Sequence, residues 1–370
     1  MRIAIVINTS WNIYNFRLCL VNAFIKQGHT VIAIAPEDEY TSLLKESGCE
    51  FVGLKMNNKG MNPVEDLALF YRLKEIYKKQ KPDVILQYTI KPNIYGSIAA
   101  AQLGIPSICN VSGLGTTFLS GSLLNRIAKS MYRFAFKRSN HVFFQNPDDR
   151  DLFINLGLVA KQKTGLLPGS GINLKSFQLR QSKVQPLRVL TFIGRLLFAK
   201  GIQEFLDATA HFEKSEYQVR FLICGSIEED AGLGITNAQL EPYLKQSNLD
   251  YLGKVDNVKE IIEASDCIIL PSYREGTPRS LIESLAMSKP IITTDVPGCK
   301  EVFNEKNGFL CKVQSTESLI RSIEKLMLVN DEDLLKMGLE SRVFAEKKFN
   351  EQIVIDSYTK IIINLTNGNK

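Results

Sequence analysis

Residues 188–201 read RVLTFIGRLLFAKG, an apolar strand pattern that ends in a glycine and leads into a helix start. The run from Arg188 to Ile193 is suited to a buried strand, and the apolar spacing of residues 201–214 predicts a helix. A strand, a tight loop and a helix in this order form the repeating unit of a doubly wound parallel sheet. Ligands of such sheets bind at the carboxyl ends of the strands. The sequence therefore places Gly194, Arg195 and Lys200 at a binding edge.

The same alternation extends in both directions along the chain. Strands are predicted at residues 3–7, 30–35, 84–87, 107–111 and 142–145, then at 188–193, 219–224, 267–270, 291–293 and 309–311. Helices are predicted at about 15–27, 63–80, 93–103, 121–138 and 147–156, then at 201–214, 257–264, 279–288 and 315–329, with 331–365 helical throughout. Residues 165–186, rich in Gly, Pro and Ser at first and then polar, interrupt the pattern and predict a domain boundary.

This organisation predicts three segments: a first doubly wound domain over 1–170, a second over 171–348, and a C-terminal helix, 349–370, packing back on the first domain. The length of 370 residues agrees with two domains, and 45% hydrophobic with 23% charged residues excludes a disordered or fibrous chain. The uncharged stretch 92–125 is broken by Gly and Pro, so no transmembrane helix is predicted.

Cysteine and histidine usage argues against disulfides and metal. The seven cysteines are odd in number and widely spaced, and no CxxC pair occurs. The three histidines are scattered, so each is interpreted as structural and no metal site is predicted. These features are typical of a reduced cytoplasmic protein.

Basic charge is concentrated in the first half of the chain. Residues 1–170 hold 20 Lys and Arg against 12 Asp and Glu, whereas residues 171–370 hold 25 against 27. No acid occurs between 84 and 147, and a helical projection of 123–138 places four cations within one arc: Arg126, Lys129, Arg133 and Lys137. One interpretation is a helix lying on an anionic membrane surface. The other is a surface helix whose basic side is merely solvated. Both stay open on the sequence alone.

Two loops of the second half have residues suited to a diphosphate. Arg195 and Lys200 follow a buried strand, and Lys200 comes just before a helix, where backbone amides also attract anions. The P-loop pattern is absent, and two such cations in a loop are ordinarily solvated. In the second loop, Glu275 precedes a helix and Glu283 lies within it. They do not share a helix face, which disfavours a glycosidase-type acid and base pair.

Taken together, these motifs resemble one enzyme family. Gly194-Arg195 with Lys200-Gly201, followed by Glu275-Gly276-x-Pro278 and the Glu-x7-Glu spacing to Glu283, resembles the retaining glycosyltransferases of family 4. Residues 253–255, 264–266, 289–292 and 295–301 match as well. The resemblance implies the α/β GT-B fold, in which two doubly wound Rossmann-like domains face a cleft, and a peripheral association with the inner face of the cytoplasmic membrane.

The resemblance also implies residue roles. It places Arg195 and Lys200 on the donor diphosphate, Glu275 beside the donor sugar and Glu283 on the ribose of a UDP-sugar. It adds six contacts to the donor, made largely by backbone groups around the base, sugar and phosphate: those of Gly194, Val255, Gly276, Thr277, Arg279 and Ser280. No cofactor beyond the donor substrate is expected, because the two cations and helix amides supply the charge that a metal supplies elsewhere.

The first-half segments 36–40, 90–96 and 112–115 resemble enzymes that extend undecaprenyl-diphosphate-linked sugars. The transferred unit so implied is a hexose or an N-acetylhexosamine, with N-acetylgalactosamine as the first expectation. The partners so implied are a UDP-sugar, a lipid-linked diphosphate saccharide and an anionic membrane, with no nucleic acid. Residues 9–17 lack the family's glycine pair, so acceptor contacts there must come from other groups. The residues proposed for the acceptor are Asn12, Arg17, Lys91 and Gly113.

Three other functions fit parts of the pattern. A soluble acceptor is the first alternative, and a UDP-sugar epimerase of the same fold is the second. A binding module without activity is the third. A Rossmann dehydrogenase is disfavoured because Gly-x-Gly-x-x-Gly does not follow the first strand.

Overall fold

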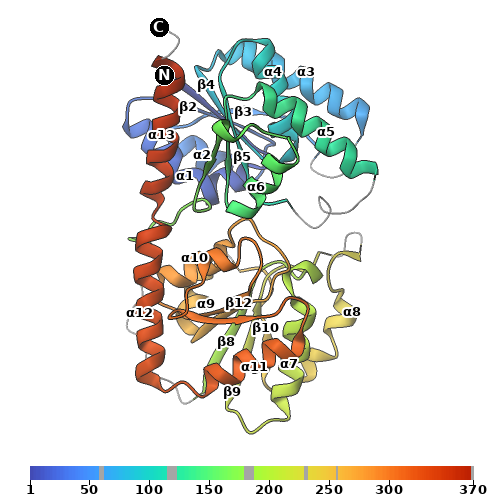
Figure 1. Cartoon of the computed structure of the whole chain (residues 1–370), viewed down its shortest axis with the longest axis vertical. Helices are drawn as coiled ribbons and strands as arrows, with labels where there is room; N and C mark the ends of the chain where they lie inside the picture. Colours follow the sequence, from blue (N-terminus) through green and yellow to red (C-terminus); the bar gives the residue numbers. More distant parts are fainter. Residues whose placement is uncertain (58–61, 115–122, 179–186, 229–231, 256, 368–370) are drawn as a thin grey trace. The chain divides into compact units, whose positions relative to one another are not determined.

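The computed structural model describes residues 1–57, 62–114, 123–178, 187–228, 232–255 and 257–367. The chain folds into two compact units (Figure 1). The first unit consists of Met1–Gly171 and Glu351–Lys370, and the second of Ile172–Asn350. The divisions fall within two residues of those predicted from the sequence.

The first unit is built on a seven-stranded sheet of order β3-β2-β1-β4-β5-β6-β7 whose neighbouring strands all run parallel. Its strands are β1 (Arg2–Val6), β2 (Thr30–Ala35), β3 (Glu50–Gly53), β4 (Val84–Tyr88), β5 (Ser107–Val111), β6 (His141–Phe144) and β7 (Thr164–Leu166). Its helices are α1 (Ser10–Lys26), α2 (Thr41–Glu46), α3 (Pro63–Gln80), the π-helical turn η1 (Pro92–Gly96), α4 (Ser97–Gln102), α5 (Leu123–Arg138), α6 (Pro147–Asn155), the 3-10 turn η3 (Lys161–Lys163) and α13 (Glu351–Asn367).

The second unit has a six-stranded sheet of order β10-β9-β8-β11-β12-β13, again parallel throughout. Its strands are β8 (Arg188–Ile193), β9 (Val219–Cys224), β10 (Leu249–Tyr251), β11 (Cys267–Leu270), β12 (Ile291–Thr294) and β13 (Gly308–Cys311). Its helices are α7 (Ile202–Glu213), α8 (Asn237–Leu240), α9 (Val258–Ala264), α10 (Arg279–Ala286), α11 (Thr316–Met327) and α12 (Asp331–Lys348), with 3-10 turns η4 (Phe198–Lys200), η6 (Tyr243–Lys245) and η7 (Lys300–Val302).

Three short strands escaped prediction, and all lie away from the sheet centres: β3 and β7 at the edges of the first sheet and β10 at an edge of the second. Helix α1 begins at Ser10 rather than near 15, because the Thr9 side chain accepts a hydrogen bond from the Asn12 amide and caps it. The predicted helix 93–103 divides into η1 and α4, and the predicted helix 331–365 divides into α12 and α13. Residues 115, 121 and 122 of the predicted segments lie outside the described residues.

Helix α13 belongs to the core of the first unit, although 179 residues of the second unit precede it in the chain. Val354, Ile355, Tyr358 and Ile362 are buried against the first sheet and α1. The Tyr358 ring lies 4.9 Å from that of Phe143, and its hydroxyl accepts a hydrogen bond from the Asn110 side chain at 3.2 Å. The last helix therefore completes a core that the first 171 residues begin.

Each sheet has one place where the chain order reverses. In the second sheet, β8 lies between β9 and β11, so the chain leaves the first strand of this unit in both directions. In the first sheet β1 lies between β2 and β4 in the same way. Loops at such positions diverge and leave a crevice at the carboxyl ends of the strands, where doubly wound proteins bind ligands.

Candidate functional site

The predicted donor residues gather at the carboxyl ends of β8 and β11, which pair directly in the second sheet. The loop after β8 contains Gly194, Arg195 and Lys200. The loop after β11 contains Glu275, Gly276 and Thr277 and leads into α10. Two segments about 75 residues apart in sequence thus share one edge of the sheet.

Gly201 allows the two loops to approach closely. Its φ is +75°, and a Cβ atom at this position would lie 2.2 Å from the carbonyl oxygen of Pro271. A hydrogen bond from the Tyr273 amide to the Ala199 carbonyl, 2.9 Å long, joins the loops on the other side of this contact. A side chain at position 201 is therefore excluded both by backbone conformation and by space.

The backbone of Glu275 is fixed from a third loop, the one after β12. The Glu275 amide donates to the Pro297 carbonyl at 3.0 Å. Gly298, with φ +88°, lies so close that a Cβ there would be 2.3 Å from the Glu275 carbonyl oxygen. These contacts hold the start of the Glu275 side chain in one place.

The Glu275 carboxylate forms an ion pair with the Lys200 ammonium and accepts a hydrogen bond from the Ser272 hydroxyl at 2.8 Å. Both charged side chains are largely buried, at 11% and 23% exposure. Removing one partner leaves the other charge in a poorly hydrated place, which is costly. The sequence identified Lys200 and Glu275 as site residues but not Ser272. The signal for Ser272 in the sequence is its place in the same loop, three residues before the Glu275 carboxylate.

Arg195 points to a different acid. Its guanidinium lies 3.2 Å from Glu228 in the loop after β9, and both side chains are substantially exposed. Arg195 and Lys200 are thus on one loop but pair with separate carboxylates in this structure. Glu228 was not predicted; the signal available was an acidic cluster directly after a predicted strand.

Helix α10 provides the second carboxylate. Glu283 accepts from the Arg279 guanidinium at 2.7 Å, four residues earlier on the same helix, and both are mostly buried. The Arg279 guanidinium also lies 6.0 Å from the ring centroid of Phe177. Pro278 is the residue just before α10, and Ser280 lies in the first turn of this helix. Glu275 and Glu283 are therefore on separate elements, as the spacing predicted.

The loops after β9 and β10 meet beside this site. The Gly225 amide donates to the Gly253 carbonyl at 2.8 Å, and the Gly194 amide donates to the Cys224 carbonyl at 2.9 Å. Val255, the predicted base contact, is partly buried against the core of this unit. Four consecutive strands of the sheet therefore end in loops that are joined to one another.

A hydrogen-bonded pair, Tyr273 with Glu204, involves the same loop as Glu275. The Tyr273 hydroxyl donates to Glu204 of α7 at 2.6 Å, and Glu204 is 9% exposed. Burial and this hydrogen bond raise the pKa of Tyr273, so its proton stays on the hydroxyl. Burial, with the charge of Glu275, raises the pKa of the Cys299 thiol to about 12, which keeps it protonated and unreactive. Neither Glu204 nor Tyr273 was singled out from the sequence.

The predicted acceptor residues lie in the first unit. The amide of Asn12 is taken by the Thr9 cap, and the neighbouring Trp11 amide donates to the Asp38 carboxylate at 2.9 Å. Arg17 is 5% exposed, with its guanidinium 4.5 Å from the ring centroid of Tyr88. It is thus an interior cation rather than a surface one.

The other two acceptor residues lie at the carboxyl ends of β4 and β5. Lys91 is mostly buried and forms an ion pair with Asp66 of α3 at 2.9 Å. Gly113 is exposed just beyond the end of β5. An acceptor role for any of the four stays a prediction.

Helix α5 covers the range predicted for the basic segment. Arg126, Arg133 and Lys137 are exposed, and Lys129 is partly exposed. Arg133 also donates to the carbonyls of Leu156 and Gly157 at 2.8 and 3.1 Å, which anchors the end of α6. Arg133 thus has a structural role at the end of α6.

Two family models match the chain, one in each unit. The first, described as glycosyl transferase 4-like, matches residues 2–146, and the second, described as glycosyl transferases group 1, matches residues 176–342. The chain belongs to the glycosyltransferases. The second match contains every predicted donor residue of this glycosyltransferase, from Gly194 to Glu283.

Relatives and solved structures agree with this assignment. The glycosyltransferase is 27% identical to N,N'-diacetylbacillosaminyl-diphospho-undecaprenol alpha-1,3-N-acetylgalactosaminyltransferase of Campylobacter jejuni, with 98% of each chain covered. It is 26% identical to UDP-Gal:alpha-D-GlcNAc-diphosphoundecaprenol alpha-1,3-galactosyltransferase of Escherichia coli, covering 75% of this chain and 74% of that one. Sucrose-phosphate synthase of Thermosynechococcus elongatus superposes with a TM-score of 0.83 at 16% identity over the whole of both chains. The glycosyltransferase therefore has the GT-B fold.

No helix among the described residues is both long and apolar enough to cross a membrane.

Proposed function

We propose that this glycosyltransferase moves an N-acetylhexosamine, N-acetylgalactosamine, from UDP to a hydroxyl of a saccharide linked through diphosphate to undecaprenol. Two relatives whose names specify undecaprenyl-diphosphate acceptors support the acceptor class. The relative that aligns over 98% of both chains is an N-acetylgalactosaminyltransferase, which supports the donor sugar. The undecaprenol of such an acceptor is anchored in a membrane, so the enzyme works at the inner membrane surface as a peripheral protein.

The observation that carries the proposal is the group of Lys200, Glu275 and Ser272 at the edge between β8 and β11. A donor diphosphate competes with Glu275 for the Lys200 ammonium, because phosphate oxygens carry more negative charge than one carboxylate. Once Lys200 turns to the diphosphate, the Glu275 carboxylate becomes an acceptor for hydroxyl groups of the donor sugar. The resting ion pair thus holds both side chains in place before the donor arrives.

The reaction then proceeds with retention at the anomeric carbon. The bond from that carbon to the UDP oxygen breaks, and the acceptor hydroxyl forms its bond on the same face. The hydroxyl proton passes to an oxygen of the donor phosphate, so the products are UDP and an α-linked saccharide. Lys200 and Arg195 stabilise the charge that develops on the leaving UDP.

A panel of UDP-sugars incubated with lipid-linked and soluble saccharides tests this function. We expect a product only with the lipid-linked acceptor, one N-acetylhexosamine heavier by mass spectrometry, with an α coupling constant by NMR. Product from a soluble saccharide alone would favour a glycosyltransferase with a soluble acceptor. An epimerised UDP-sugar formed without any acceptor would favour a UDP-sugar epimerase.

Activity is expected to be independent of metal ions. Lys200, Arg195 and the amides at the start of α10 supply the positive charge that Mg²⁺ or Mn²⁺ supplies in other transferases. Turnover measured in excess EDTA should therefore stay within about two-fold of the untreated rate, since the rate depends on charges fixed in the protein. A complete loss that Mn²⁺ reverses would contradict this prediction.

Glu283→Ala is expected to weaken UDP binding rather than the chemical step. A carboxylate on the ribose hydroxyls contributes about 1.5–3 kcal/mol, so the Kd for UDP should rise roughly ten-fold or more. Calorimetry with UDP alone measures this. Glu317→Ala is the matched control, because Glu317 of α11 also forms an ion pair with an arginine four residues away, Arg321, but both of these side chains are exposed. Equal UDP affinity in both variants would remove Glu283 from the nucleotide site.

A further inference from the structure

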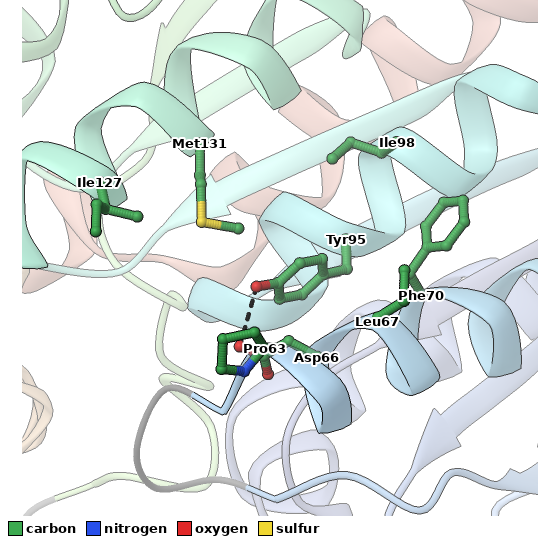
Figure 2. A pocket seen from close by; sticks show the side chains of 8 residues that line it. All are labelled: Pro63, Asp66, Leu67, Phe70, Tyr95, Ile98, Ile127 and Met131. Carbon is green, nitrogen blue, oxygen red and sulfur yellow. Dashed lines mark hydrogen bonds between the residues drawn. The ribbon is translucent and has the colours of Figure 1, made fainter.

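An apolar groove lies on the first unit among α3, α4 and α5 (Figure 2). Its volume is about 550 Å³, within the range of sites that hold small molecules. Six apolar side chains line it: Pro63, Leu67, Phe70, Ile98, Ile127 and Met131. Figure 2 shows Ile127 and Met131 on α5 facing Leu67 and Phe70 on α3 across this space.

The two polar residues in the lining are already paired with each other. The Tyr95 hydroxyl donates to the Asp66 carboxylate at 3.0 Å, and the Lys91 ammonium balances that carboxylate at 2.9 Å. Burial and the hydrogen bond to Asp66 raise the pKa of Tyr95, so the hydroxyl stays a donor to Asp66. A polar ligand therefore finds few open partners here, and the groove suits a hydrocarbon.

Apolar side chains continue from the groove onto the surface. Leu67 is 56% exposed and Ile127 is 42% exposed. Val64 and Tyr71 are exposed on the same face of α3 as Leu67, and Phe134 is exposed about two turns beyond Ile127 on α5. Monomeric proteins seldom leave such side chains grouped without a partner.

Positive charge lies beside the apolar rim. Arg126 and Lys137 are exposed on α5, and the Arg138 guanidinium stacks on the Phe134 ring with its carbon 3.5 Å from the ring centroid. The sequence from 84 to 147, which includes α5, holds no acid. An occupant that is apolar within the groove and anionic beside it matches this surface in both respects.

We propose that the groove binds part of the polyprenyl chain of the acceptor lipid, while the cations of α5 lie against anionic headgroups. This rests on the proposed function, because that function provides a substrate with a long isoprenoid chain at a membrane surface. Leu67 and Ile127 then contact the chain, and Arg126 and Lys137 contact headgroup phosphates. The groove thereby recognises the lipid part of the acceptor.

The test compares two double variants and one control. Leu67→Gln with Ile127→Gln makes the groove rim polar, and Arg126→Glu with Lys137→Glu reverses the charge beside it. Arg133 is left unchanged because it anchors α6. Leu335→Gln with Leu339→Gln is the control, since both leucines are exposed on α12 of the second unit.

Flotation uses vesicles of phosphatidylglycerol and phosphatidylcholine in equal parts, with and without undecaprenyl phosphate. We expect undecaprenyl phosphate to increase binding of the wild-type and control proteins, and the groove variant to lose that increase, with about ten-fold weaker binding. The charge variant should lose binding to both kinds of vesicle. An equal loss by the groove variant without undecaprenyl phosphate would show that the rim inserts into bulk lipid instead, and no loss at all would overturn the proposal.

A kinetic measurement separates this proposal from the proposed function. The ratio of kcat/KM for a long-chain acceptor to that for a short-chain acceptor with the same saccharide should fall about ten-fold in the groove variant and stay constant in the control. An unchanged ratio would mean that the polyprenyl chain of the acceptor does not bind in the groove. If no acceptor gives product while the flotation result holds, the proposed function fails and the groove assignment stands. If the wild-type protein dimerises in solution and the groove variant does not, the occupant is a second copy of this chain.

Discussion

Replacing Lys200 by alanine should lower turnover by a factor of about 30 to 1,000. The loss of one fixed donor that stabilises charge in a transition state is worth roughly 2–4 kcal/mol. The substitution also removes the ammonium beside the Glu275 carboxylate, which is 11% exposed and still accepts a hydrogen bond from the Ser272 hydroxyl. Steady-state kinetics with saturating donor measures the effect on kcat.

Two further variants make this result specific. Lys325→Ala removes an exposed lysine from α11 and should leave turnover unchanged. Lys200→Ala combined with Glu275→Gln also removes the carboxylate charge, so its folding stability should recover while its turnover stays low. Turnover near the wild-type rate in Lys200→Ala would show that this ammonium does not act on the leaving diphosphate.

Replacing Gly201 by alanine should lower the free energy of unfolding by about 3 kcal/mol and abolish most activity. A left-handed backbone costs a residue with a side chain roughly 1–2 kcal/mol, and forcing an atom into packed structure costs about 1–3 kcal/mol more. Here the added Cβ meets the Pro271 carbonyl oxygen at 2.2 Å, so the loops that hold Lys200 and Glu275 must separate. Urea unfolding and a turnover assay report the two effects.

Gly232→Ala is the control for the backbone contribution. Gly232 has a similar φ, +66°, but a Cβ there meets nothing within 4 Å. It should lose only about 1 kcal/mol and keep its activity, because strain alone is then the cost. Equal destabilisation by both substitutions would mean that the contact with Pro271 is not what the glycine preserves.

The fold was largely predictable because its central strands are continuous β-branched and apolar runs. The ranges 30–35, 107–111, 219–224 and 267–270 agree with β2, β5, β9 and β11 residue for residue. Strands β3 (EFVG), β7 (TGL) and β10 (LDY) escaped because each is short and contains a glycine or an acid that breaks the apolar run. Such short segments at a sheet edge pack on one side, and their sequence shows little periodicity.

The candidate site was predictable in its residues but not in its pairings. Lys200 and Glu275 were identified by motif, yet their ion pair depends on the close approach that Gly201 permits between two loops. Lys91 was expected to meet a diphosphate, whereas the nearest charge in the structure is Asp66 of α3. Arg17 points inward because it lies on the same face of α1 as the buried Ile13, Leu20 and Phe24. Contacts of this kind depend on tertiary packing, which spacing alone does not contain.

The return of α13 to the first unit has a consequence for how the protein is made. Proteins with contiguous domains generally fold from the N-terminus during synthesis, each domain closing as it leaves the ribosome. Here the first 171 residues lack Val354, Ile355, Tyr358 and Ile362 of their own core until the whole second unit has been made. The second unit, a single continuous segment, has all its residues first. The half of the enzyme that is translated first is therefore the last to complete its fold, and a nascent chain stalled before residue 351 holds one finished unit and one open core.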